Sequence, residues 1–237
     1  MPLRDALART VPVAAGPVSV AWLSDDRRIG VRSQIELLGE LDRERTAGLR
    51  RARLKQFVLG RVLLRRLVEE LFPDATGWTV QPGACPRCGE RHAGVELVGV
   101  PARASVAYAE GLVVAAVAPS ETVSRLGIDV ERDAHDQERA EELRRLIGAS
   151  RENVLRRWTR VEAVLKADGR GLLIDPGAVW LRRGGGWIAG GAQSYLVCEI
   201  DGPQGYLISL AWSAAAEASA QPPARRLAGP AGDRWLA

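Results

Sequence analysis

Residues 157–172 read R-W-T-R-V-E-A-V-L-K-A-D-G-R-G-L, and this stretch decides the fold of the second half of the chain. Its apolar residues recur at helical spacing, so we expect a helix that ends near Gly169. Glu162 precedes Lys166 by four residues, which places a carboxylate and an ammonium on one helix face. Lys166 is one of only two lysines among 33 basic residues. Because a lysine can lose its proton and an arginine cannot, this choice indicates chemistry at that face.

A second acidic signal, G-I-D-V-E, occupies residues 127–131. Strand alternation places Asp129 and Glu131 on one face and Val130 on the other. Two neighbouring carboxylates repel, so they need a cation, a proton or a basic partner, and Mg²⁺ bound to phosphate oxygens meets that need. With Glu162 as a third acid, the sequence predicts a divalent-metal phosphoryl-transfer site. The alternatives are solvated acids at a strand end and an ordinary ion pair along the helix.

Composition limits the class of protein. The chain has 237 residues, 46% hydrophobic and 26% charged, which fits a soluble globular protein of one domain or two small ones. Its net charge of +4 suits an anionic ligand such as a nucleotide. It is too small to imply binding to bulk nucleic acid, and no basic–aromatic interleaving is present, so we expect no nucleic-acid partner.

The sequence also predicts the compartment. No apolar run reaches the roughly 18 residues of a membrane span, so we expect no membrane association. Residues 11–23 are apolar, but Asp5 precedes them and Gly16 and Pro17 interrupt them, which favours a first strand over a signal peptide. Three cysteines do not make a disulfide framework, so we expect a cytoplasmic protein.

The order of predicted elements indicates an α+β fold with two similar halves. A strand, a long helical region within 33–71 and several strands are followed by a strand, a helical region within 133–168 and further strands. We expect an N-terminal half at 1–118, a C-terminal half at 119–213 carrying the acidic motifs, and a disordered tail at 214–237. Ser150 is the expected cap of the second helix in the later region. The expected C-terminal strands are 179–181, 187–188, 195–200 and 206–212.

The two motifs resemble those of a known family. G-I-D-V-E at 127–131, W-T-R-V-E-A-V-L-K-A-D-G-R-G-L at 158–172 and the interval between them closely resemble the signature motifs of Sfp-type 4′-phosphopantetheinyl transferases. F-V-L-G-R-V-L-L-R at 57–65 is similar to the family's N-terminal helix, and residues 106–117 are similar to its strand pair before the first motif. The C-terminal strands match only in pattern. The resemblance implies a monomer with a pseudo-twofold α+β fold and coenzyme A (CoA) bound between the halves.

The resemblance also implies an activity. The chain would transfer 4′-phosphopantetheine from CoA to a serine of an acyl or peptidyl carrier protein, as in secondary-metabolite biosynthesis. Asp129, Glu131 and Glu162 would hold Mg²⁺ together with the pyrophosphate of CoA. Glu162 would accept the serine proton, and Lys166 would bind the phosphates and neutralise the leaving 3′,5′-adenosine bisphosphate.

Contacts to CoA are expected from the N-terminal half. By the resemblance, Arg61 is a candidate for the 3′-phosphate, and Arg51 and Arg53 are candidates by looser analogy. The alternative for all three is a solvated basic helix face. The family usually carries Ser-His where this chain has Ala107-Tyr108, and a tyrosine can donate one hydrogen bond but cannot become cationic.

Other positions depart from the family pattern in the same direction. The region that usually contains a basic residue before proline reads H-A-G-V at 92–95, and Val161 replaces a lysine. Several cationic contacts are therefore missing while the metal and base positions remain. The alternative to an active transferase is a divergent member that binds CoA or a carrier protein without transferring, or that serves another CoA-linked step of a biosynthetic pathway.

Cys85, Cys88 and His92 have the spacing of three zinc ligands. A fourth ligand is not apparent in the sequence, although Cys198 or an acid could complete the set. Similar Cys-Pro-x-Cys-Gly turns occur in actinobacterial members of the family. Structural zinc and a metal-free turn therefore both stay open.

Overall fold

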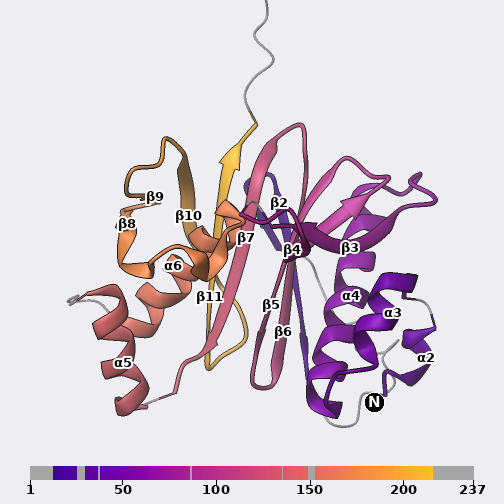
Figure 1. Cartoon of the computed structure of the whole chain (residues 1–237), viewed down its shortest axis with the longest axis horizontal. Helices are drawn as coiled ribbons and strands as arrows, with labels where there is room; N and C mark the ends of the chain where they lie inside the picture. The colour runs from indigo at the N-terminus through magenta and orange to yellow at the C-terminus, as the bar shows by residue number, and fades with distance from the viewer. Residues whose placement is uncertain are drawn as a thin grey trace, which may run out of the picture.

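The computed structural model describes residues 13–25, 30–36, 38–85, 87–134, 136–148 and 153–215. Within these residues the protein is a mixed α+β structure with antiparallel strand pairing throughout (Figure 1). The disorder expected for residues 214–237 concerns a segment that lies outside the described residues from 216 onward. None of the helices described is long and apolar enough to cross a membrane.

The elements follow one another in two groups. The first comprises β1 (Val13–Ala15), β2 (Val18–Ser24), α2 (Arg32–Ile35), α3 (Glu40–Thr46), α4 (Arg51–Leu71), β3 (Thr79–Ala84), β4 (Arg91–Val98), β5 (Ala102–Ala109) and β6 (Leu112–Pro119). The second comprises β7 (Val123–Arg132), α5 (Gln137–Ile147), α6 (Val154–Asp168), the 3-10 turns η1 (Gly171–Leu173) and η2 (Pro176–Ala178), β8 (Val179–Arg182), β9 (Gly185–Ile188), β10 (Ser194–Ile200) and β11 (Tyr206–Ala214).

The strands form two main sheets and a separate hairpin. The N-terminal sheet has the order β1-β2-β6-β5, the C-terminal sheet has the order β7-β11-β10-β9-β8, and β3 pairs with β4 alone. The edge strands β5 and β7 contact each other where the sheets meet. There the hydroxyl of Ser105 accepts a hydrogen bond from the backbone N–H of Ile128 at 3.0 Å, so a side chain replaces a ladder bond between the sheets.

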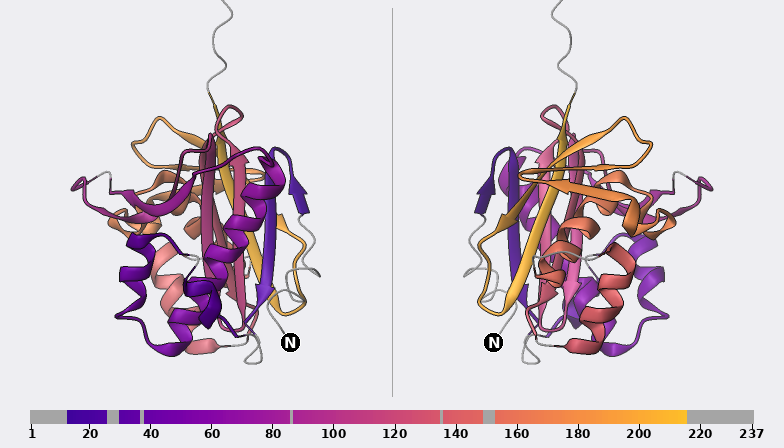
Figure 2. Two further views of the ribbon diagram at one scale, coloured as in Figure 1. Left: turned by 90° about the vertical axis from the view of Figure 1, so that its right-hand side faces the viewer. Right: turned by 90° about the vertical axis from the view of Figure 1, so that its left-hand side faces the viewer.

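Strand β6 shows how the core is built. Val113, Ala115 and Val117 face α4, while Leu112, Val114 and Ala116 face the C-terminal sheet, and none of these residues is more than 2% exposed. Both faces are therefore apolar, as expected for a strand buried between layers. A helix covers one face of each main sheet, α4 in the left view of Figure 2 and α6 with α5 in the right view, and the other faces of the sheets share a central core.

The predicted elements are recovered with two refinements. The helical region predicted within 33–71 is divided into three helices, because Gly39 and Arg50 take extended backbone conformations before α3 and α4. The carboxamide of Asn153 accepts hydrogen bonds from the backbone N–H groups of residues 155 and 156, so Asn153 caps α6. Ser150, the predicted cap, lies outside the described residues. Helix α6 ends as predicted at Gly169, whose φ of +90° belongs to the left-handed region.

Candidate active site at the contact of β7 and α6

Gly127 allows α6 to pack directly on β7. A Cβ atom at this position would lie 2.1 Å from the carbonyl oxygen of Ala163 and 2.4 Å from the backbone nitrogen of Ala167. Any side chain would therefore push the helix away from the strand. Asp129 and Glu131 share the strand face of Gly127, so this close approach brings them to the side chains of α6.

Asp129 forms the central contact of the site. Its Oδ1 accepts a hydrogen bond from the ammonium of Lys166 at 2.6 Å, and its carboxylate is almost fully buried, with a side-chain exposure of 9%. Oδ2 is buried with no hydrogen-bond partner among the described residues. Burial raises the pKa of Asp129 to about 6, although the charge of Lys166 opposes the shift. Because Lys166 bonds across to β7, an ordinary ion pair along the helix does not account for it.

Glu131 lies two residues further along the same strand face. Arg139, on the first turn of α5, donates to Glu131 Oε1 at 2.5 Å. Burial raises the pKa of Glu131, and the charge of Asp129 raises it further, while Arg139 and a hydrogen bond from Trp158 lower it. The sequence pattern had not indicated Arg139, because its position against Glu131 depends on how α5 packs after the strand.

Glu162 completes the group of three acids. Its side chain is half-buried on α6. Burial raises the pKa of Glu162, the charge of Lys166 lowers it, and the charge of Glu131 raises it again. The charge of Glu162 in turn raises the pKa of Asp129. The acids of the two sequence motifs are therefore brought within electrostatic range of one another.

The donor set suits a hard cation, but it is not arranged as a finished metal site. In the described part of the chain, no group of three or more His, Cys, Asp or Glu residues is placed to hold a metal ion together. Lys166 and Arg139 engage two of the three predicted ligands. Asp129 Oδ2, however, is a buried oxygen without a partner, which is the kind of group that a cation satisfies. Residue chemistry and this oxygen fit Mg²⁺, and its binding stays a prediction.

Arg61 lies in a different environment from the one expected of a phosphate ligand. Its Nε and Nη2 donate to the two carboxylate oxygens of Asp42 at 2.5 and 3.1 Å, and both side chains are nearly inaccessible. The guanidinium also stacks 4.4 Å from the ring centre of Phe57. Its charge is therefore already balanced inside the protein. Arg51 and Arg53, by contrast, are exposed on the first turn of α4, as in the alternative of a solvated basic face.

Tyr108 packs against α4. A Cβ atom on Gly60 would lie 2.8 Å from its hydroxyl oxygen, so only a glycine in the helix leaves room for the phenol. Burial raises the pKa of Tyr108, and the charge of Arg61 lowers it more than that of Lys166. This neutral side chain therefore lies within electrostatic range of both the buried arginine of the N-terminal half and the lysine of the acidic site.

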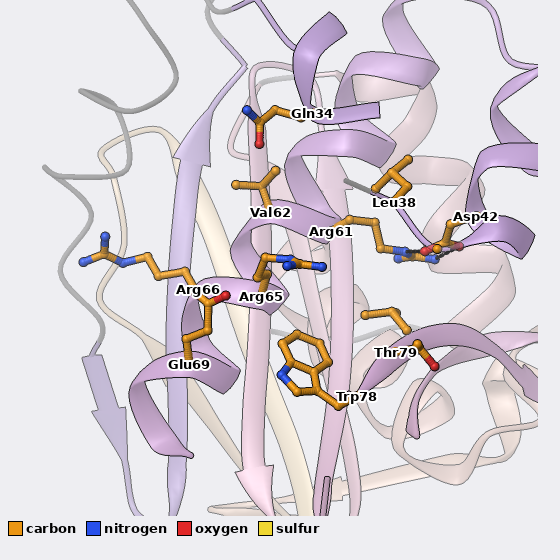
Figure 3. Close-up of a pocket in the computed structure, with 12 residues that line it drawn as sticks. Gln34, Leu38, Asp42, Arg61, Val62, Arg65, Arg66, Glu69, Trp78 and Thr79 are labelled. Carbon is orange, nitrogen blue, oxygen red and sulfur yellow. Dashed lines mark hydrogen bonds and ion pairs between the residues drawn. The ribbon is translucent and has the colours of Figure 1, made fainter. Parts of the chain in front are cut away.

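A cavity of about 350 Å³ opens beside Arg61 between α4, the α2–α3 segment and the start of β3 (Figure 3). The guanidinium of Arg65 lies 5.5 Å from the ring centre of Trp78 on one wall. Guanidinium groups and an indole ring are suited to phosphates and to planar rings. Sequence reasoning missed this cavity, because it treated Trp78 only as part of a strand. Its lining residues include Gln34, Leu38, Asp42, Arg61, Arg65, Arg66 and Trp78.

The candidate zinc ligands are only partly described. Cys85 is buried and Cys88 is exposed, at a turn between β3 and β4, and both are thiols. Backbone N–H groups of Cys88 and Arg87 donate to the sulfur of Cys85 and lower the pKa of that thiol. The side chain of His92 lies outside the described residues. Cys198 packs against the central core where the sheets meet and belongs to no metal-binding group among the described residues, so it is not the fourth ligand.

Comparisons with known proteins add no assignment. No family model matches the chain, and no curated protein matches it. The functional interpretation therefore depends on the residues and their geometry.

Proposed function

We propose that this protein transfers 4′-phosphopantetheine from CoA to a serine of an acyl or peptidyl carrier protein. The observation that carries the proposal is the contact of Lys166 with Asp129 at 2.6 Å, with Glu131 and Glu162 alongside. The two motifs that resemble those of the transferases are distant in sequence, yet their charged residues meet at one place. Gly127 of the first motif makes that meeting sterically feasible.

The chemical roles follow from burial and charge. Glu162 is half-buried with a raised pKa, so it is a better proton acceptor near neutral pH than an exposed glutamate. The Lys166 side chain is 30% exposed and can reach both Asp129 and an incoming phosphate. Asp129, Glu131 and Glu162 would hold Mg²⁺ together with the diphosphate of the donor. When bound, that ion would supply charge neutralisation for phosphoryl-type transfer.

The arrangement of the elements supports the pseudo-twofold architecture that the proposal implies. Each half has one main helix packed on an antiparallel sheet, α4 on the N-terminal sheet and α6 on the C-terminal sheet. The sheets meet at β5 and β7, so a donor bound near this contact would touch both halves. The cavity beside Arg65 and Trp78 offers a basic, aromatic surface for the nucleotide part of CoA.

A second function is favoured by the N-terminal half alone. Arg61 is neutralised by Asp42, and Tyr108 is a neutral side chain packed on Gly60. A protein with weakened phosphate contacts would bind CoA or a carrier protein without transferring. In that case replacing Glu162 would leave ligand binding and every other function of the protein unchanged.

Transfer can be tested by incubating the protein with CoA, Mg²⁺ and a panel of apo carrier proteins, and by weighing the carriers. We expect the mass gain of one phosphopantetheine group on at least one carrier. Glu162→Gln and Lys166→Met should slow transfer by about 100-fold or more, because they remove the base and a cation at the reacting phosphate. Glu199→Gln and Lys55→Met are matched controls, because each is an ion-paired residue outside the site.

Two results would decide against the proposal. No mass gain with any carrier, despite Mg²⁺-dependent binding of CoA, would favour the binding function. Equal loss of transfer in Lys55→Met and Lys166→Met would mean that lysine removal acts through stability instead of through the reacting phosphate.

A further inference from the structure

The turn that joins β3 to β4 is tightly built around two sulfur atoms. The backbone N–H of Cys85 donates to the carbonyl oxygen of Glu90 at 2.7 Å, and the N–H of Gly89 donates back to the carbonyl oxygen of Cys85 at 2.8 Å. Gly89 has a φ of +77°, which lets the chain reverse directly after Cys88. A register shift between Pro82 and Ala84 ends regular pairing just before the turn.

The backbone of this turn surrounds the sulfur of Cys85. The N–H groups of Arg87 and Cys88 both donate to that sulfur, and the two cysteine side chains are hydrogen-bonded to each other. Cys85 is 3% exposed, whereas Cys88 reaches the surface. Backbone donors aimed at a sulfur favour its thiolate form, and the thiolate is the form that binds metal ions.

The two sulfurs have the separation that one metal ion requires. Two thiolates bound to a tetrahedral zinc ion at about 2.3 Å lie about 3.8 Å apart, which is also the range of a contact between hydrogen-bonded sulfurs. We propose that the Cys85–Cys88 turn binds one thiophilic divalent cation, with Zn²⁺ as the reference ion, through both sulfurs. This site is separate from the acidic site, and it does not depend on the proposed transferase activity.

The remaining ligands follow from the sequence. Among the side chains that the structure describes, no third His, Cys, Asp or Glu joins the two sulfurs. His92 follows Cys88 at the spacing of a third zinc ligand. Its side chain is not described, so its participation is a matter for substitution. Water would occupy the fourth position, as in other zinc sites with three protein ligands.

Metal binding would fix a segment that is weakly held by its own hydrogen bonds. Strands β3 and β4 pair only with each other, and a two-stranded sheet is marginally stable in isolation. The other end of β3 and the preceding residue, Thr79 and Trp78, line the cavity beside α4. A metal ion at the turn would therefore stiffen one wall of that cavity.

The test uses the full-length protein, reduced and freed of metal with a chelator, in the absence of CoA. Zn²⁺ is titrated in competition with a chromophoric chelator, and Co²⁺ is added in a parallel experiment to report thiolate ligands by charge-transfer absorption. We expect one Zn²⁺ per chain, release of protons on binding, and thiolate-to-cobalt bands. Cys88→Ser and Cys85→Ser should each weaken Zn²⁺ binding by more than about 100-fold, which exceeds the loss typical of an outer-sphere partner.

Controls separate metal binding from folding. Cys198→Ser removes the third thiol of the chain and should leave the affinity unchanged. Cys88 is exposed, so Cys88→Ser keeps the test valid if Cys85→Ser does not fold. His92→Ala should weaken binding less than either cysteine change.

Three outcomes would overturn the inference. The first is absence of Zn²⁺ binding while both thiols are reduced. The second is equal Zn²⁺ affinity in the wild type and Cys88→Ser. The third is ready formation of a Cys85–Cys88 disulfide with a small oxidised disulfide reagent, without Zn²⁺ retention, because the turn would then be a redox pair. None of these results depends on whether the protein transfers phosphopantetheine.

Discussion

The buried carboxylate of Asp129 should destabilise the folded protein above neutral pH. Its pKa rises from an ordinary value of 3.8 to about 6 in the folded state. Each pK unit corresponds to about 1.4 kcal/mol, so the fully ionised side chain costs about 3 kcal/mol of unfolding free energy. This cost is absent below pH 4, where both states are protonated. It grows as the pH rises through 6, and it is complete above pH 7.

The substitution Asp129→Asn removes the ionisation but keeps an oxygen for Lys166, whose ammonium remains partly hydrated. It also relieves Glu131, because the charge of Asp129 raises the pKa of that neighbour. Both effects have the same sign. We therefore expect the unfolding free energy of Asp129→Asn, relative to wild type, to rise by about 3 kcal/mol between pH 4 and pH 7.5. The same variant should lose transferase activity, as expected for a site where function opposes stability.

Urea unfolding at intervals between pH 4 and pH 8 measures this difference, with Mg²⁺ excluded. Asp201→Asn is the control, because Asp201 is an exposed aspartate in the loop before β11. Its difference from wild type should stay constant with pH. A difference for Asp129→Asn that is flat, or that falls as the pH rises, would refute the assignment of a raised pKa to this carboxyl group.

Three further predictions concern packing and metal binding. Gly127→Ala should destabilise the protein by about 3 kcal/mol or more in thermal or urea unfolding, because its Cβ would overlap the backbone of α6, whereas Gly94→Ala, with open space around it, should have little effect. Asp42→Asn should cost about 3–5 kcal/mol by leaving the buried Arg61 without its charged partner, and a stability unchanged by this substitution would contradict the buried pair. Mg²⁺ should raise the melting temperature of the wild type more at pH 8 than at pH 5.5, because binding needs ionised carboxylates, and calorimetry should show no such gain for Asp129→Asn.

The main elements and the acidic residues of the site could be predicted from the sequence because local patterns determine them. Strand alternation placed Asp129 and Glu131 together, helical spacing placed Glu162 and Lys166 together, and Gly169 marked the end of the helix. The packing role of Gly127 could not be predicted in this way. It depends on the distance between a strand and a helix that are separated by more than thirty residues of sequence.

Pairings between distant elements were also missed for a physical reason. Arg61 matched a basic position of the family motif, but its charge is buried against Asp42 of another helix. An arginine in a sequence does not indicate whether its partner is a ligand or a neighbouring carboxylate. The same limit applies to Arg139, which was not singled out, although it balances Glu131 at the site.

The balance of charge at the site bears directly on how a diphosphate donor would bind. The three carboxylates of Asp129, Glu131 and Glu162 are countered by Lys166 and Arg139, which leaves one excess negative charge when all are ionised. Because Arg61 is neutralised elsewhere, it cannot reverse this sign. An anionic donor would thus meet repulsion unless a further cation accompanies it, and a divalent ion bridging a carboxylate oxygen such as Asp129 Oδ2 and the phosphates would change the local balance to attraction. The raised pKa values of the three acids reflect the same shortage of positive charge in a desolvated place, so the cost that Asp129 imposes on folding and the affinity for a metal–diphosphate donor have one physical origin.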